Sequence, residues 1–442
     1  MAEIAVDAAA DAALAQQALA AGARLPLSGA DRRRIAFYFA GLIVLLGFCE
    51  NLTPIPVTFF LKNHFHLAAH QIALFGLVAA IPVYCAMAFG FIRDISNPLG
   101  RGDRGFIILA GAAGAAACAA FSFMTPSVGL LLAAALTISA AVLFVSSAVR
   151  GLIGSVGQQN AATGQASALV STAGTAPLVA AVLLGGLLSD ELERHPAGES
   201  ARILFLAAAA MLAATSLYGL LKPASVFAHV RRERMVGDHP LNDLRRLVRH
   251  GPIYPALLIW LLWQFVPGLG TPLQFFMQNT LHFRDSEYGL WFALYFGGAA
   301  PAYVLFGFLC RRLPLRTLLL WGTVAAIPMM LPLLFIRDPT FALAAAAPMG
   351  LLSGVGGAAY FDLIIRSCPP GLQGSVLMAS TALLSIDGQF GNLLGSALFD
   401  HFHDFTVCVI AMTATNTLIL PALLLVPRRL TATRDGEPLP AA

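Results

Sequence analysis

Long apolar runs alternate with short polar breaks from Ile35 to Pro427, and twelve such runs are distinguishable. Each run is roughly 20 residues long, the length that a helix needs to cross the hydrocarbon core of a bilayer. Only helices and closed barrels satisfy their backbone hydrogen bonds inside lipid. The pattern therefore predicts twelve membrane-spanning helices, at residues 35–59, 71–92, 105–124, 128–149, 163–188, 201–221, 253–277, 287–310, 315–336, 340–365, 372–399 and 404–426.

Composition and charge strengthen this prediction and orient the chain. Hydrophobic residues make up 58% and charged residues only 11%, too few charges to cover the surface of a soluble protein. With the amino terminus placed in the cytosol, 22 Lys and Arg residues fall on the inner side and 5 on the outer side. This bias predicts that both termini are cytosolic, in a multi-pass protein of the plasma membrane, such as a bacterial inner membrane. The net charge of +4 then indicates contact with anionic lipid, not nucleic-acid binding.

The longest polar interruption, residues 222–251, divides the spans six and six. Weak repeats support this division, because Pro56 and His66 match Pro272 and His282 at an offset of 216. Other matches occur at an offset of 210, for example Gly164 with Gly374. We therefore expect an all-α membrane protein with two pseudo-symmetric six-helix bundles, in the parallel two-half arrangement that binds its substrate between the halves. The expected boundaries are a cytosolic tail at 1–34, bundles at 35–221 and 252–427, a cytosolic linker at 222–251 and a second tail at 428–442.

Two carboxylates lie at membrane depth, and we consider both as proton-coupling candidates. Glu50 is about 22 Å along the first span, since a helix rises about 1.5 Å per residue. Asp387 lies in the eleventh span, in an unusually polar stretch with Gln389 and Asn392. A charge inside the membrane is costly unless it is paired or faces water. The alternatives are neutralisation by a neighbouring helix or an interfacial position for Glu50, and hydrogen bonding between helices for Asp387.

Spans one and seven are interrupted at corresponding places, by Pro54 and Pro56 in one and by Pro267, Gly268 and Pro272 in the other. Freed backbone groups are tolerated in a membrane only beside protein or a water-filled cavity, so these breaks predict the substrate cavity. The alternative is a pair of kinks that only shape packing. Polar and aromatic residues near these levels are the cavity candidates: Asn51, Tyr84, Gln264, Gln274, Tyr295, Tyr360, Gln389 and Asn392.

Charged residues at the predicted cytosolic ends of the spans are candidates for a gate. Arg150 and Asp362 lie near the ends of spans four and ten, and Asp362 is spaced to pair with Arg366 along one helix. The alternative is anchoring at the membrane interface, which suits Arg366 best.

The loop from Gly90 to Arg104 reads GFIRDISNPLGRGDR. It resembles the loop signature of the major facilitator superfamily, and its long gap from Asp94 to Gly100 is similar to that of the folate-biopterin transporter family. The stretches AIPVY at 80–84 and PPG at 369–371 are similar to that family too, although Val83 and Gln373 depart from its usual pattern. The resemblance implies a gate formed by Gly90, Asp94, Gly100 and Arg104, and a folate- or pterin-like substrate.

The predicted function is secondary active transport of a small organic solute by alternating access, coupled to protons, by a monomer without a cofactor. Export of a drug-like molecule or another metabolite is the alternative within transport. The chain has no ATP-binding P-loop motif, which argues against a primary pump. A membrane-embedded enzyme and a transporter-like sensor are further alternatives. For an enzyme, the sequence offers one cluster on the outer side, a weak metal site at Asp400, His401, His403 and Asp404. The six scattered cysteines predict neither disulfides nor a structural metal.

Overall fold

The structure, a computed structural model, describes residues 29–223, 226 and 240–437, except residues 68, 284 and 337. Every element within these residues is a helix. Most of the predicted tail at 1–34 and the middle of the predicted linker at 222–251 lie outside the described residues.

The amino-terminal half forms one bundle. Its helices are α2 (Gly29–Asn51), α3 (Pro54–Asn63), α4 (Ala69–Ala79), α5 (Ile81–Tyr84), α6 (Ala86–Ile95), the short 3₁₀ helix η1 (Pro98–Gly100), α7 (Asp103–Phe121), α8 (Val128–Gln159), α9 (Thr163–Glu193) and α10 (Ala197–Leu220).

The carboxy-terminal half forms the second bundle. Its helices are α12 (Pro240–Arg249), α13 (Ile253–Gln264), α14 (Thr271–Phe275), the π-helical turn η2 (Phe276–Thr280), α15 (Asp285–Leu309), α16 (Leu315–Ala326), η3 (Ile327–Phe335), α17 (Pro339–Ser367), α18 (Gln373–Phe402), α19 (Phe405–Ala422), η4 (Leu423–Leu425) and α20 (Arg428–Thr431).

Within the described residues, nine helical segments are long and apolar enough to cross a membrane. The other three predicted spans differ for physical reasons. The second and seventh are broken into short helices beside Pro82 and Pro267, and α18 is long but carries several polar residues. The predicted fold class is confirmed, with each of the twelve predicted runs lying on a helix or a broken helix.

The internal repeat is visible in the backbone. His66 and His282, which are 216 residues apart, both have left-handed φ angles, 51° and 57°. Ala161 and Gly371, 210 residues apart, share this feature with φ angles of 48° and 85°. A non-glycine residue with positive φ is uncommon, so its recurrence at matched positions shows that the two halves repeat one chain path.

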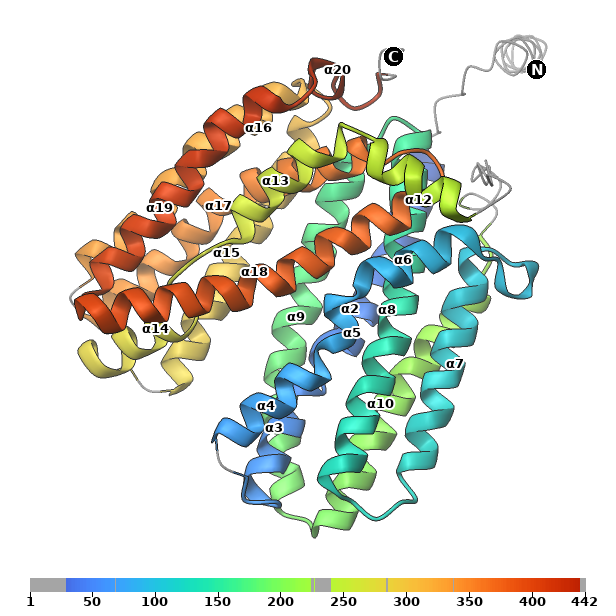
Figure 1. Cartoon of the computed structure of the whole chain (residues 1–442), viewed down its shortest axis with the longest axis vertical. Helices are drawn as coiled ribbons and strands as arrows, with labels where there is room; N and C mark the ends of the chain where they lie inside the picture. Colours follow the sequence, from blue (N-terminus) through green and yellow to red (C-terminus); the bar gives the residue numbers. More distant parts are fainter. Residues whose placement is uncertain are drawn as a thin grey trace, which may run out of the picture.

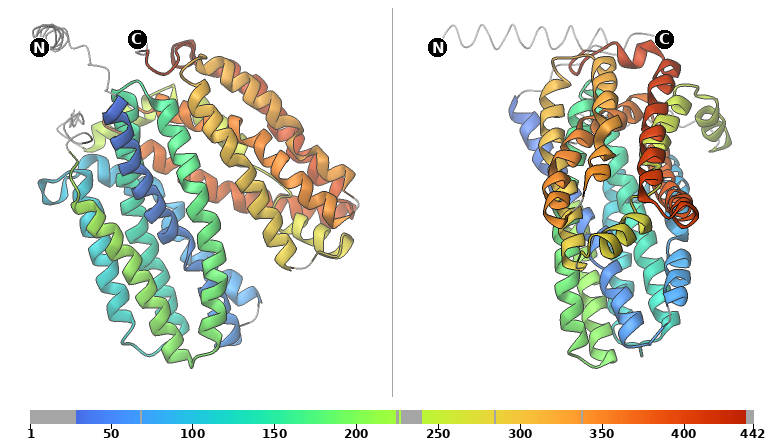
Figure 2. Two further views of the ribbon diagram at one scale, coloured as in Figure 1. Left: turned by 180° about the vertical axis from the view of Figure 1, so that it is seen from behind. Right: turned by 90° about the vertical axis from the view of Figure 1, so that its left-hand side faces the viewer.

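The two bundles approach each other at one end and diverge towards the other (Figures 1 and 2). Helix α6 packs on α18, and α9 packs on α15. The carboxy-terminal helix α20 lies at the end where the bundles meet, which we call the closed end. Large apolar side chains such as Phe37, Phe123 and Leu424 are exposed, as expected of surfaces that face lipid.

Candidate functional site

A central cavity lies between the halves, and it has two lobes that share Arg150, Thr381 and Leu384. The lobe on the carboxy-terminal side, the aromatic lobe, has a volume of about 650 Å³. The lobe on the amino-terminal side, the acidic lobe, has a volume of about 480 Å³ and includes Glu50. These volumes suit small organic molecules.

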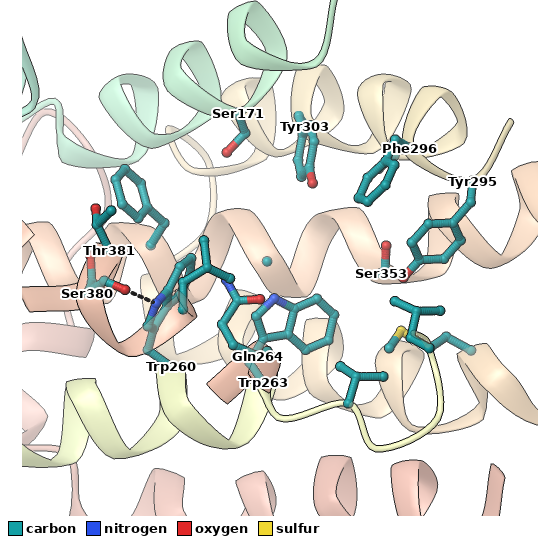
Figure 3. Close-up of a pocket in the computed structure, with 18 of the residues that line it drawn as sticks. Ser171, Trp260, Trp263, Gln264, Tyr295, Phe296, Tyr303, Ser353, Ser380 and Thr381 are labelled. Atoms are coloured by element: carbon teal, nitrogen blue, oxygen red, sulfur yellow. Dashed lines mark hydrogen bonds between the residues drawn. The ribbon is translucent and has the colours of Figure 1, made fainter. Parts of the chain in front are cut away.

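Helix α13 supplies one wall of the aromatic lobe, and α15 supplies the opposite wall. Figure 3 shows Trp260, Trp263 and Gln264 on one side and residues of α15 on the other. The Trp260 indole nitrogen donates a hydrogen bond to the carbonyl oxygen of Ser380 at 3.0 Å, which fixes its ring on α18. The rings lining this lobe are Trp260, Trp263, Phe292, Tyr295, Phe296, Tyr303 and Phe361.

The break after α13 shapes the floor of the aromatic lobe. The helix ends at Gln264, and the chain stays non-helical until α14 begins at Thr271. Gly268 has a φ of 128°, a conformation that L-residues with side chains avoid. The side-chain oxygen of Asn392 accepts a hydrogen bond from the Thr271 N–H at 2.8 Å. This bond satisfies one of the backbone donors that the break leaves at the start of α14.

The acidic lobe lies beside the matching break between α2 and α3, and Glu50, Thr53 and Pro54 line it. One Glu50 carboxylate oxygen is 3.9 Å from a terminal guanidinium nitrogen of Arg150, with both side chains partly exposed. The Arg150 Nε donates to the Ser146 hydroxyl at 3.0 Å, which orients the guanidinium. Glu50 and Arg150 are the only charged side chains among the described residues that line the two lobes.

Asp387 lies on α18 outside the lining of the lobes and is only 5% exposed. Its Oδ2 atom has no hydrogen-bond partner among the residues that the structure describes. Gly391, one turn further along α18, packs against the backbone of Val266 in the break, so Asp387 is close to the level where α13 ends. A buried carboxylate oxygen without a partner is costly, which keeps Asp387 a candidate for proton exchange.

The cavity candidates from the sequence therefore divide into two groups. Gln264, Tyr295 and Asn392 line the aromatic lobe. Tyr360 was expected there but is fully buried, where it hydrogen-bonds Thr323 at 2.7 Å behind the ring of Trp263. The other candidates, which do not line either lobe, are Asn51, Tyr84, Gln274 and Gln389.

At the closed end, Asp94 joins the two halves. Its Oδ1 accepts a hydrogen bond from the Gly374 N–H at 3.1 Å, and its Oδ2 accepts from the Ser375 N–H at 2.7 Å and hydroxyl at 2.6 Å. These donors lie in the first turn of α18, where backbone N–H groups have no partner within the helix. Arg93 pairs with Asp94 at 2.7 Å and with Asp103 at 2.6 Å.

Two further contacts hold the halves together at this end. Gly90 packs so closely on α18 that a Cβ atom there would be 2.3 Å from the Gly374 carbonyl oxygen. The Gln158 amide donates to the carbonyl oxygens of Ile365 at 2.6 Å and Cys368 at 2.8 Å. The end is therefore closed by backbone and side-chain bonds that cross between the bundles.

The remaining gate candidates occupy three different places. Arg150 is in the cavity, because α8 continues nine residues beyond it to Gln159. The Arg104 guanidinium donates to the carbonyl oxygens of Gly219 at 3.1 Å and Leu220 at 2.6 Å within the first bundle. Asp362 is fully buried near the end of α17 and pairs with Arg366 at 3.0 Å, and Arg366 in turn contacts the start of α9 in the first bundle.

Gly100 lies in the short turn η1, with a φ of 65° that favours glycine.

The alternative metal site at the opposite end is not supported. Within the part of the chain that the structure describes, no three His, Cys, Asp or Glu side chains are grouped to hold a metal ion. Asp404 instead caps α19 by accepting a hydrogen bond from the Thr406 N–H at 2.8 Å.

The sequence was next compared with known families. A model described as Major Facilitator Superfamily matches residues 159–391 and 269–440, which together exceed half of the chain. The chain belongs to the Major Facilitator Superfamily. It is a multi-pass membrane protein with the fold of secondary transporters of small solutes.

Solved structures of this superfamily are similar across most of the chain. FucP, a superfamily transporter in the outward conformation, has a TM-score of 0.68 and 15% identity, over 89% of this chain and 98% of that one. The proton:xylose symporter XylE has a TM-score of 0.65 and 13% identity, over 91% and 98%. A bacterial homologue of the iron transporter ferroportin in the outward-facing state has a TM-score of 0.62 and 17% identity, over 88% of this chain and 98% of that one. No curated protein sequence matches this one.

Sequence reasoning missed several residues of this superfamily member's cavity. Trp260 and Trp263 lie on one side of α13, three residues apart, immediately before the break at Pro267. Residues at that spacing share a helix face. This signal was available, because the same break was already expected to lie beside the cavity.

Proposed function

We propose that this chain transports a small planar organic anion by alternating access, in symport with protons. Folate- and pterin-like compounds are the first candidates. The observation that carries the proposal is the position of Arg150, a cavity cation between an aromatic lobe and Glu50.

The substrate class follows from the lining of the cavity. Seven aromatic rings line the aromatic lobe, and rings stack on planar ligands. Arg150 offers a guanidinium that binds carboxylates through charge-assisted hydrogen bonds. Gln264 and Asn392 add neutral hydrogen-bonding groups. A folate- or pterin-like molecule with a carboxylate satisfies all three features, in agreement with the family resemblance of the loop at Gly90–Arg104.

Proton coupling follows from the distance between Glu50 and Arg150. At 3.9 Å the two side chains are close enough to interact but leave the guanidinium open to a second acceptor. A bound carboxylate beside an ionised Glu50 would place two negative charges on one cation in a partly dehydrated cavity, which is unfavourable. Protonation of Glu50 removes this repulsion, so substrate and proton bind together. Asp387 is the second candidate for this role.

The orientation follows from the basic residues of the loops. The closed end carries the loop at Gly90–Arg104 and the residues around Arg428, which the charge bias assigns to the cytosol. In this orientation the molecule is closed towards the cytosol and its cavity faces outward. The similarity to FucP in the outward conformation agrees with this assignment.

A ligand screen by thermal shift tests the substrate class, because a specific ligand raises the unfolding temperature. Purified protein is screened against folates, pterins, sugars and peptides, and stabilisation by carboxylated pterins is expected. The variant Arg150→Gln should bind the stabilising anion about 10- to 100-fold more weakly, the loss expected for one charged hydrogen-bond partner. Arg194→Gln, whose arginine is exposed and pairs with Glu191 at 3.1 Å, is the control. Equal binding by Arg150→Gln and wild type would rule out the anion site.

Export of a drug-like molecule is the second candidate, favoured by the large apolar share of the aromatic lobe. Transport assays in oriented proteoliposomes distinguish the two. An imposed inward proton gradient should drive accumulation in a symporter and extrusion in an exporter that exchanges its substrate for protons.

A further inference from the structure

Two contacts between the halves lie at the closed end, at positions that the internal repeat relates. They differ in the residue that faces the helix start. In the first, Asp94 of α6 holds the start of α18. The offset of 216 found at Pro56 and Pro272 matches Asp94 to Cys310, just after α15, and the offset of 217 between Gly90 and Gly307 matches it to Arg311. Neither position carries a carboxylate. The geometry agrees, because a Cβ on Gly374 would lie 2.6 Å from Asp94 Oδ1 and a Cβ on the matching Gly164 would lie 2.7 Å from Cys310 Cβ. A thiol is a weak hydrogen-bond acceptor, so Cys310 cannot replace the carboxylate.

Asp435, in the segment that follows α20, supplies a carboxylate at this second contact. Its Oδ1 accepts a hydrogen bond from the Gly164 N–H at 3.1 Å, and its Oδ2 accepts from the Gln165 N–H at 2.8 Å. These are the first-turn donors of α9, as Gly374 and Ser375 are for α18. The Cys310 thiol donates to the same Oδ2 at 3.5 Å. The Asp435 side chain is only 1% exposed.

Backbone bonds hold this segment in place on both halves. The Asp435 N–H donates to the Cys310 carbonyl oxygen at 2.9 Å in the second bundle. The next residue, Gly436, donates its N–H to the Ala161 carbonyl oxygen at 2.7 Å in the first bundle. The segment therefore bridges the bundles through main chain and side chain together.

Arg366 completes the second contact in the way that Arg93 completes the first. Its guanidinium pairs with Asp435 at 3.2 Å and with Asp362 at 3.0 Å. It also donates to the Thr433 carbonyl oxygen at 2.8 Å and to the Thr163 hydroxyl at 3.1 Å, at the start of α9. Both contacts thus consist of an aspartate on a helix start, a buried arginine and a second aspartate.

We propose that Asp435 and its segment form the second latch of the closed end, in place of the carboxylate missing at Cys310. Asp435 is a positioning residue, because it holds α9 against α15 and is not among the residues that line the two lobes. The latch has to release α9 before the closed end opens. The inference rests on the alternating-access part of the proposed function and is independent of the substrate.

Two native cysteines report the state of the latch. The Cys310 thiol contacts the Asp435 carboxylate, and Cys310 is 1% exposed. The Cys368 carbonyl oxygen accepts a hydrogen bond from Gln158 across the two halves, and Cys368 is 4% exposed. Purified full-length protein without substrate is alkylated with N-ethylmaleimide, and each site is quantified by mass spectrometry. In Asp435→Ala, N-ethylmaleimide should react with both cysteines about tenfold faster than in wild type. The reason is that the loss of charge-assisted hydrogen bonds makes opening of the closed end more frequent. Glu437→Ala, which removes an exposed carboxylate two residues away that pairs with Arg434, should match wild type.

A rescue variant separates a latch from simple packing. In Asp435→Ala combined with Cys310→Asp, the carboxylate returns at the position that matches Asp94, and alkylation of Cys368 should return to the wild-type rate. A chain shortened after Ala432 serves as a second test if Asp435→Ala is poorly folded. Its cysteines should show the same tenfold faster alkylation that is expected for Asp435→Ala. Unchanged alkylation of Cys368, with or without faster alkylation of Cys310, overturns the latch. Failure to find a substrate leaves this result untouched, because no substrate is used.

Discussion

The close approach of α6 and α18 at Gly90 gives a sharp prediction for Gly90→Ala. An added methyl group would lie 2.3 Å from the Gly374 carbonyl oxygen, 2.7 Å from its carbonyl carbon and 2.9 Å from Met378 Cβ. Two of these three atoms belong to the backbone, so a side-chain rotation cannot relieve the clash. The helices have to separate by about 1 Å to reach ordinary van der Waals distance.

Overpacking of this kind costs about 1–3 kcal/mol. The cost applies only while the closed end is closed, because separation of α6 from α18 removes the clash. Gly90→Ala should therefore shift the equilibrium away from the closed end by about 5- to 150-fold. Gly76→Ala is the matched control, because it makes the same change in the same predicted span. Its methyl group would have no atom of the described residues within 4 Å, apart from its own chain neighbours.

Hydrogen–deuterium exchange measures this shift directly. The Gly374 and Ser375 amides are bonded to Asp94 only while the closed end is closed. Peptides that cover residues 372–378 should exchange faster in Gly90→Ala than in wild type or Gly76→Ala, by a factor in the range given above. Equal exchange in all three proteins would show that α6 and α18 yield locally, and the steric argument would then be wrong.

Three further predictions concern coupling, topology and pH. Glu50→Gln should abolish uptake driven by a proton gradient but preserve exchange of labelled for unlabelled substrate, and unchanged accumulation in proteoliposomes would move the coupling role to Asp387 or elsewhere. A cysteine at position 237, in a background that lacks the native cysteines, should resist an impermeant thiol reagent in intact cells, and labelling from outside would contradict a cytosolic linker. Burial and the nearby Asp362 carboxylate raise the pKa of Asp435 to about 6, against the opposing effect of Arg366. The stability gained from protonating Asp435 is therefore lost as pH rises from its unfolded pKa of 3.8 through about 6. The unfolding temperature of wild type should fall relative to Asp435→Asn between about pH 4 and about pH 6.5 and stay level above that.

Features encoded in a short stretch of chain could be predicted from the sequence. The apolar runs predicted the helices, since the length of a span depends on consecutive residues. The broken helices beside the two lobes were predictable from Pro54 and Pro267, because proline and glycine act locally on the backbone. Asp94 could be proposed as a gate residue because its loop has a recognisable pattern.

Features that depend on distant parts of the chain could not be predicted in this way. Arg150 was taken as the end of a span because a charge usually marks the interface, whereas the cavity allows it to lie within a longer helix. Nothing near Asp435 in the sequence indicates that it caps a helix that begins 272 residues earlier, at Thr163. Arg104 is a similar case, because its acceptors are the carbonyl groups at the end of α10.

The distribution of tryptophan has an optical consequence. All four tryptophans, at positions 260, 263, 291 and 321, belong to the second half of the chain. Trp260 and Trp263 line the aromatic lobe, while Trp291 is buried and Trp321 is exposed on the outer surface. A ligand that enters the lobe displaces water from two of the four indoles and leaves the others unchanged. The intrinsic fluorescence of the unmodified protein should therefore report occupancy of the cavity, and Trp263→Phe should reduce that signal without the attachment of any dye.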